Sequence, residues 1–136
     1  MLKKYRDHGL LLLRIGIGIM FVLHGYPKVF GGPEMWAKVG GAMANLGIGF
    51  APTFWGLIGA LAEFGGGILL IFGLLTRPIA AAMAFTMVVA ASVHLSAGEG
   101  LMGASHAIEL GIVFVSLILV GPGRFSVDSR RFPALG

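Results

Sequence analysis

A few ionisable side chains interrupt an otherwise apolar sequence, and they are the side chains that could do chemistry. Histidine and carboxylate groups can exchange protons and hydrogen-bond a ligand, whereas Lys and Arg can bind anionic groups. A charge near the middle of a membrane-spanning helix costs roughly 2.5–3.5 kcal/mol, so such groups are expected to face one another inside a bundle. The residues of this kind within the apolar runs are Arg14, His24, Lys28, Glu63, His94, His106 and Glu109.

Their spacing places several of them on shared helix faces. At 100° per residue, Lys28 lies about 40° from His24 around the helix axis, and Arg14 lies about 80° from it. His106 and Glu109 are three residues apart, so they also share one face of a helix. We therefore expect these residues to point into the core of a helix bundle.

The elements that must position these residues are transmembrane helices. Hydrophobic residues make up 57% of the 136-residue chain and charged residues only 12%, whereas a soluble domain carries about 25% charged residues. A soluble domain of this length could not bury so much apolar surface. The expected fold is all-α: one domain over residues 1–136, an integral membrane four-helix bundle with spans at about 9–30, 52–75, 78–95 and 104–120.

The segment 34–49 between the first two spans has a different pattern. It is too short to cross a bilayer, and Met35, Val39 and Met43 recur at helical spacing. We expect a short amphipathic helix that is interfacial or re-entrant. Pro52 suits the first turn of the second span, and residues 76–78 (Thr-Arg-Pro) predict a tight turn before the third.

The basic residues predict how the chain is oriented. With four spans, both ends and the 76–78 turn lie on one side of the membrane. The positive-inside rule makes this side cytoplasmic, which predicts a multi-pass protein of the inner (plasma) membrane with cytoplasmic N- and C-termini. The net charge of +4 then marks orientation and not nucleic-acid binding. On that side lie Lys3, Lys4, Arg6, Arg77, Arg124, Arg130 and Arg131, against Lys28 and Lys38 on the other.

The same topology predicts depth. Glu63 is expected below the other groups and Arg14 lower still, whereas the remaining ones lie near the outer ends of their helices. This arrangement predicts a polar pocket that opens toward the outer leaflet. Ion pairs such as Arg14–Glu63 and Lys28–Glu109 could instead lock the helices in register without any chemistry. The residues expected at the outer height are His24, Lys28, His94, His106 and Glu109.

These residues also carry a resemblance to a known family. The first span reads Arg14-x3-Gly18-x2-Phe21-x2-His24-Gly25-x2-Lys28, and the second reads Glu63-x2-Gly66-Gly67 followed by Gly73-Leu74-x-Thr76-Arg77. His94 and Glu109 follow on the third and fourth spans, and the tail reads Gly121-Pro122-Gly123-Arg124-Phe125-Ser126-Val127-Asp128. In this order the sequence resembles the DoxX family of small four-helix membrane proteins. His106 is not part of that motif.

The resemblance implies redox work at the quinone pool, because DoxX members are similar to the quinone-reducing membrane subunit of thiosulfate:quinone oxidoreductase. The first hypothesis is therefore a membrane subunit of a quinone-linked oxidoreductase that binds a quinone, or a similar amphiphile, in the polar pocket. Its electrons would come from a redox partner protein or a bound cofactor. The candidate catalytic residues are His24, Glu63, His94 and Glu109, and the candidate ligand-binding residues are Arg14, Lys28 and His106.

Two alternatives stay open. The chain could be a non-enzymatic module that binds or transports a small amphiphile, or an assembly partner of another membrane protein. Small residues such as Gly16, Gly18, Gly56 and Gly59 would then support packing within the bilayer, including a homo-oligomer.

The second alternative is a haem or metal site. His24 and His94 could ligate haem b, or could form a two-His-one-carboxylate metal site with Glu109. Lys28 nearby argues against a bound cation, because it adds positive charge. The sequence contains no cysteine, which excludes thiolate sites.

Overall fold

The structure, a computed structural model, describes residues 2–135, and within this range the chain is helical without strands. Four of its helices are long and apolar enough to cross a membrane, namely α1, α3, α4 and α5. The predicted all-α membrane bundle is therefore confirmed. The elements are α1 (Leu2–Val29), α2 (Gly32–Gly40), the 3-10 helix η1 (Gly41–Leu46), α3 (Pro52–Phe72), α4 (Thr76–Ser96), α5 (Gly100–Val120), α6 (Val127–Arg131) and the 3-10 helix η2 (Pro133–Leu135).

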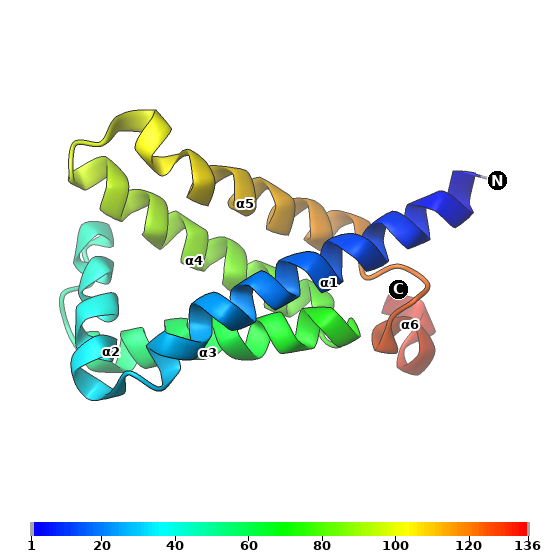
Figure 1. Ribbon diagram of the computed structural model, residues 1–136, viewed down its shortest axis with the longest axis horizontal. Helices are drawn as coiled ribbons and strands as arrows, with labels where there is room; N and C mark the ends of the chain where they lie inside the picture. The colour runs from blue at the N-terminus through cyan, green and yellow to red at the C-terminus, as the bar shows by residue number, and fades with distance from the viewer. Residues whose placement is uncertain (1, 136) are drawn as a thin grey trace.

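The four long helices form two antiparallel pairs, α1 with α3 and α4 with α5. Contacts within each pair are more extensive than contacts between the pairs. Figure 1 shows α2 and the α4–α5 loop at one end of the bundle, and the start of α1 and α6 at the other. We call these the α2 end and the α6 end. A ligand site between the pairs is therefore bounded by helices from both of them.

Local sequence explains where α3 and α4 begin and end. Pro52 occupies the first turn of α3, as predicted. Gly73 ends α3 in the left-handed conformation, with φ of 68°. The tight turn was predicted at residues 76–78, which is wrong, because Thr76 already begins α4. A proline at position 78 is compatible with the first turn of a helix, where its nitrogen needs no hydrogen-bond partner.

The segment after α1 packs across the α2 end of the bundle (Figure 1). Its helix begins earlier than predicted, at Gly32, and is followed by η1. Glycines let the backbones of α2 and α3 touch, since a Cβ at Gly56 would overlap the carbonyl oxygen of Trp36 and one at Gly40 that of Pro52. The indole Nε1 of Trp36 donates to the carbonyl oxygen of Lys28 at 3.0 Å. The first turns of α3 therefore pack on α2.

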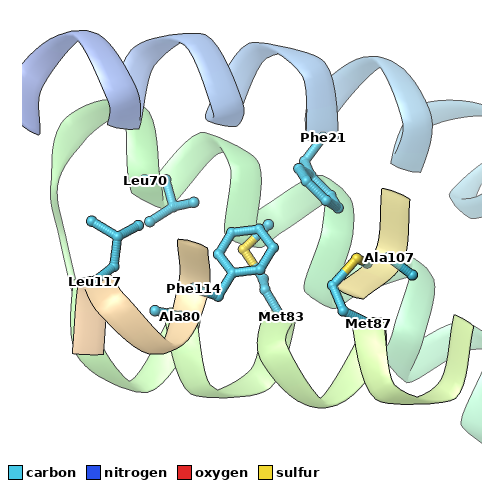
Figure 2. Packing of buried hydrophobic residues seen from close by; sticks show 8 residues of the cluster. All are labelled: Phe21, Leu70, Ala80, Met83, Met87, Ala107, Phe114 and Leu117. Carbon is cyan, nitrogen blue, oxygen red and sulfur yellow. The ribbon is translucent and has the colours of Figure 1, made fainter. Parts of the chain in front are cut away.

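A buried apolar cluster joins the two helix pairs, as Figure 2 shows. Phe21 of α1 meets Phe114 of α5 edge to face, with ring centroids 5.2 Å apart. Such an aromatic contact contributes about 0.5–1.5 kcal/mol beyond the burial of its surface. The cluster comprises Phe21, Leu70, Ala80, Met83, Met87, Ala107, Phe114 and Leu117.

Candidate functional site

A cavity of about 390 Å³ lies between the two helix pairs and extends toward the α2 end. All four long helices contribute to its wall. Most of the lining is apolar, and this part comprises Ile17, Met20, Phe21, Met87, Ala90, Ala107 and Leu110. The polar part comprises His24, Lys28, Glu63, His94 and His106. The structure thus brings five of the seven sequence-predicted site residues to one cavity.

An ion pair between Lys28 and Glu63 forms part of the cavity wall. The ammonium Nζ lies 2.8 Å from Oε2 and 3.0 Å from Oε1 of the carboxylate. The Glu63 side chain is only 7% exposed, whereas that of Lys28 is 33% exposed. Small residues bring the two helices together here, since a Cβ at Gly25 would lie 2.5 Å from the backbone nitrogen of Phe64.

This ion pair replaces both of the pairs suggested by the sequence. Arg14–Glu63 and Lys28–Glu109 do not form, and Glu63 lies at the height of Lys28 instead of below it. The reason is the register of the helices. Because the first turns of α3 pack on α2, α1 ends opposite the middle of α3.

Arg14 lies outside the cavity, toward the α6 end, and is fully buried. Its guanidinium donates to the carbonyl oxygens of Leu70 at 3.1 Å and Ile71 at 3.5 Å, and to that of Phe125. The first two carbonyls belong to the last turn of α3, whose helix dipole favours a nearby cation. The geometry therefore gives Arg14 a structural position and does not bring it to a ligand.

Asp128 complements Arg14 on the other side of the α3–α4 turn. Its two carboxylate oxygens accept hydrogen bonds from the backbone N–H groups of Leu75 and Thr76, each at 2.8 Å. The backbone N–H of Asp128 donates to the carbonyl oxygen of Gly73 at 3.0 Å. We call Arg14, Gly73 and Asp128 the α3–α4 clamp. It fastens the C-terminal segment to the turn between α3 and α4.

Three histidines from three helices line the cavity. The Nδ1 atom of His24 lies 2.7 Å from the carbonyl oxygen of Met20. A carbonyl only accepts, so Nδ1 carries the hydrogen and Nε2 is the acceptor in the neutral ring. His94 is bound through Nδ1 to Glu99. His106, which is not part of the DoxX motif, lines the same cavity from α5.

Glu109 is exposed on α5 and is not among the residues that line the cavity. The cavity faces His106, Ala107 and Leu110, and Glu109 points about 100° away from the centre of that face. Sharing a face with His106 was therefore not enough to bring it inward.

A metal site on His24, His94 and Glu109 does not fit this arrangement. Within residues 2–135 there is no group of three His, Asp or Glu side chains close enough to hold a metal ion. The suggested two-His-one-carboxylate set is not assembled, because Glu109 faces away from the histidines. Haem ligation by His24 and His94 stays a prediction.

A larger apolar groove, of about 650 Å³, runs along α4 and α5. Its polar side chains are Ser92 and Ser116. Their hydroxyls donate to the carbonyl oxygens of Val89 and Ile112 in their own helices. The groove offers no group for acid–base chemistry, so the smaller cavity is the candidate site.

Comparison with known proteins places the chain in a family. A family model for DoxX matches residues 9–96. The chain belongs to the DoxX family. This DoxX protein is 35% identical to the inner membrane protein YqjF of Escherichia coli (strain K12) over 130 residues, covering 93% of this chain and 95% of that protein. It is 28% identical to the inner membrane protein YphA of the same organism over 143 residues, covering 93% and 97%.

A shorter match is to a Bacillus subtilis (strain 168) protein named "Putative oxidoreductase CatD". It shows 36% identity over 87 residues and covers 64% of this DoxX protein and 60% of that one. No solved structure matches the chain. With its four apolar helices and its inner membrane relatives, this DoxX protein is a multi-pass inner membrane protein.

Proposed function

We propose that this DoxX protein is the membrane subunit of a quinone-linked oxidoreductase and that the cavity between its helix pairs binds the quinone head group. The observation that carries the proposal is the combination of apolar walls with three imidazoles and an ion pair in one space. Ligand cavities of about 300–1,000 Å³ with a few convergent polar groups are typical of small-molecule sites. The quinone role implied by the DoxX resemblance is consistent with this chemistry.

The polar residues divide into donors and proton-exchanging groups. His24 and His94 hydrogen-bond the quinone oxygens and exchange protons with them, and His106 contributes a third imidazole. Lys28 has three donor hydrogens, so its ammonium can bind Glu63 and still reach a ligand. Because Glu63 balances the charge of Lys28, the pair leaves the cavity suited to a neutral head group.

Reduction of a quinone to a quinol takes two electrons and two protons. The residues that line the cavity donate and accept the protons, and a redox partner protein supplies the electrons. Arg14 and Glu109 lie outside the cavity and have no part in binding the head group.

The test uses the purified full-length protein in nanodiscs and a short-tailed quinone analogue, with binding measured by equilibrium dialysis. We expect saturable binding that His24→Ala weakens about tenfold, because it removes one hydrogen-bond partner in an apolar site. His8→Ala is the matched control. His8 lies on the same helix, and its Nδ1 contacts the carbonyl oxygen of Lys4 at 2.6 Å, as His24 contacts that of Met20.

Two results would overturn the proposal. One is a wild-type protein that binds no quinone analogue. The other is a His24→Ala variant whose affinity equals that of the wild type and of His8→Ala.

We propose assembly with another membrane protein as a second function, on the strength of Glu109. Its carboxylate is exposed on a membrane-spanning helix, where a charge costs roughly 2.5–3.5 kcal/mol unless it is paired. A second copy of the chain or a partner protein would supply the pairing cation. Glu109→Gln should reduce the mass of the detergent-solubilised complex, whereas Glu34→Gln on α2 should not. A mass unaffected by Glu109→Gln would contradict this assignment.

A further inference from the structure

The α4–α5 loop holds a carboxylate against one of the cavity histidines. Nδ1 of His94 is hydrogen-bonded to Oε2 of Glu99, and the backbone N–H of Glu99 donates to the carbonyl oxygen of His94 at 3.1 Å. His94 lines the cavity, whereas Glu99 does not. The two side chains are 44% and 50% exposed. Glu99 therefore contacts His94 from outside the set of residues that line the cavity.

The local backbone is shaped to keep Glu99 in this place. Gly98 and Gly100 have φ of 76° and 72°, conformations that favour glycine, so the chain turns on both sides of Glu99. A Cβ at Gly103 would overlap the Cβ of Glu99 and lie 3.1 Å from Oε2. Glycine at position 103 thus leaves room for the carboxylate. Glu99 also directly precedes α5, where the helix dipole favours a negative charge.

The contact fixes which nitrogen of His94 can meet a ligand. A carboxylate accepts and does not donate, so Nδ1 carries a hydrogen and Nε2 is left for the cavity. A carboxylate behind an imidazole sets both its tautomer and its ring orientation. The other titratable groups facing the cavity are His24 and Lys28 from α1, Glu63 from α3 and His106 from α5. None of these is hydrogen-bonded to Glu99 within the described residues.

We propose that Glu99 is the positioning residue of His94: it holds the ring with Nε2 presented to the bound head group. This inference rests on the proposed quinone function for its consequence, but the orientation of the ring can be measured without any ligand. Glu99 is not part of the DoxX motif.

The first experiment reads the tautomer of His94 by ¹⁵N NMR of histidine-labelled protein in nanodiscs, with the signal assigned from its loss in His94→Gln. We expect the Nδ1–H tautomer in the wild type. Glu99→Ala should lose this preference and Glu99→Asp should retain much of it. Gly103→Ala should act like Glu99→Ala, because it displaces the carboxylate without altering either partner. Glu34→Gln, another acidic residue at the α2 end, should leave the spectrum unchanged.

The second experiment measures the affinity for the short-tailed quinone analogue in the same variants. Glu99→Ala should weaken binding about tenfold, and Glu99→Asp should restore most of it. If the wild type binds no analogue, the proposed function fails, whatever the tautomer. If the wild type binds it but Glu99→Ala keeps both the tautomer and the affinity, the positioning role is refuted and the proposed function stands.

Discussion

The Lys28–Glu63 pair allows a quantitative test, because its two members are buried to very different degrees. Lys28→Met leaves the carboxylate of Glu63, 7% exposed, without its cation. Stranding a buried charge in this way costs about 3–5 kcal/mol of unfolding free energy. Glu63→Gln leaves a lysine that is 33% exposed and can extend its ammonium toward water, so its cost is smaller, about 1–2 kcal/mol.

The assay is unfolding in mixed micelles by a denaturing detergent, with helix content followed by circular dichroism. The double variant Lys28→Met/Glu63→Gln should cost less than the sum of the single variants by about 1–3 kcal/mol, since each single change strands the other partner. Lys38→Met is the control, because this lysine is exposed on α2 and should change stability by at most about 0.5 kcal/mol. Equal costs for the two single variants, adding fully in the double variant, would refute the reasoning.

Three further predictions follow from other parts of the bundle. Arg14→Gln should destabilise the protein by about 1.5–3 kcal/mol in the same assay, because it weakens charged hydrogen bonds of the α3–α4 clamp. A loss of unfolding free energy smaller than that of Lys38→Met would contradict the clamp. Gly56→Ala should lower the thermal midpoint of unfolding, because its Cβ would overlap the backbone of α2. Gly59→Ala on the same helix places its Cβ more than 4 Å from any neighbour and should be neutral or stabilising. Equal thermal midpoints for the two variants would contradict the packing of α2 on α3. The chain has no cysteine, so single cysteines can be introduced to test the orientation. Ala97→Cys should react with a membrane-impermeant thiol reagent in intact spheroplasts, and Ser129→Cys only after lysis. The reverse pattern would refute the positive-inside orientation.

Much of the fold was accessible from the sequence because lipid imposes a strong pattern. Long apolar runs identify the spanning helices, and the shared helical face of His24 and Lys28 predicts correctly that both reach the same cavity. The cost of charge in lipid also explains why ionisable residues within the spans tend to face the interior of the bundle. Five of the seven candidate residues line one cavity, where their polar groups avoid the cost of facing lipid.

The remaining features depend on register and on backbone partners, which the apolar pattern does not encode. Glu63 meets Lys28 because glycines set the height of α1 against α3, and Gly25 against Phe64 is visible only in three dimensions. The sequence pattern places Arg14 among the ligand-binding residues because it reveals charged side chains but not backbone carbonyls. In the structure the hydrogen-bond partners of Arg14 are backbone carbonyls. The apolar pattern does not single out Glu99, because it lies in the loop between two spans. Its flanking glycines, Gly98 and Gly100, are the one sequence signal of a constrained turn there.

The α3–α4 clamp has a consequence for how a bulky lipid-soluble molecule would reach the cavity. The clamp joins the two helix pairs at the α6 end. At the α2 end η1 packs on α4, whereas α1 and α5 make few contacts with each other. The bundle therefore opens most easily between α1 and α5 at the α2 end, and both helices line the cavity there. We expect the ligand to enter sideways from the bilayer between α1 and α5. Spin labels on these two helices near the α2 end should then show a broader distance distribution than labels near the α6 end.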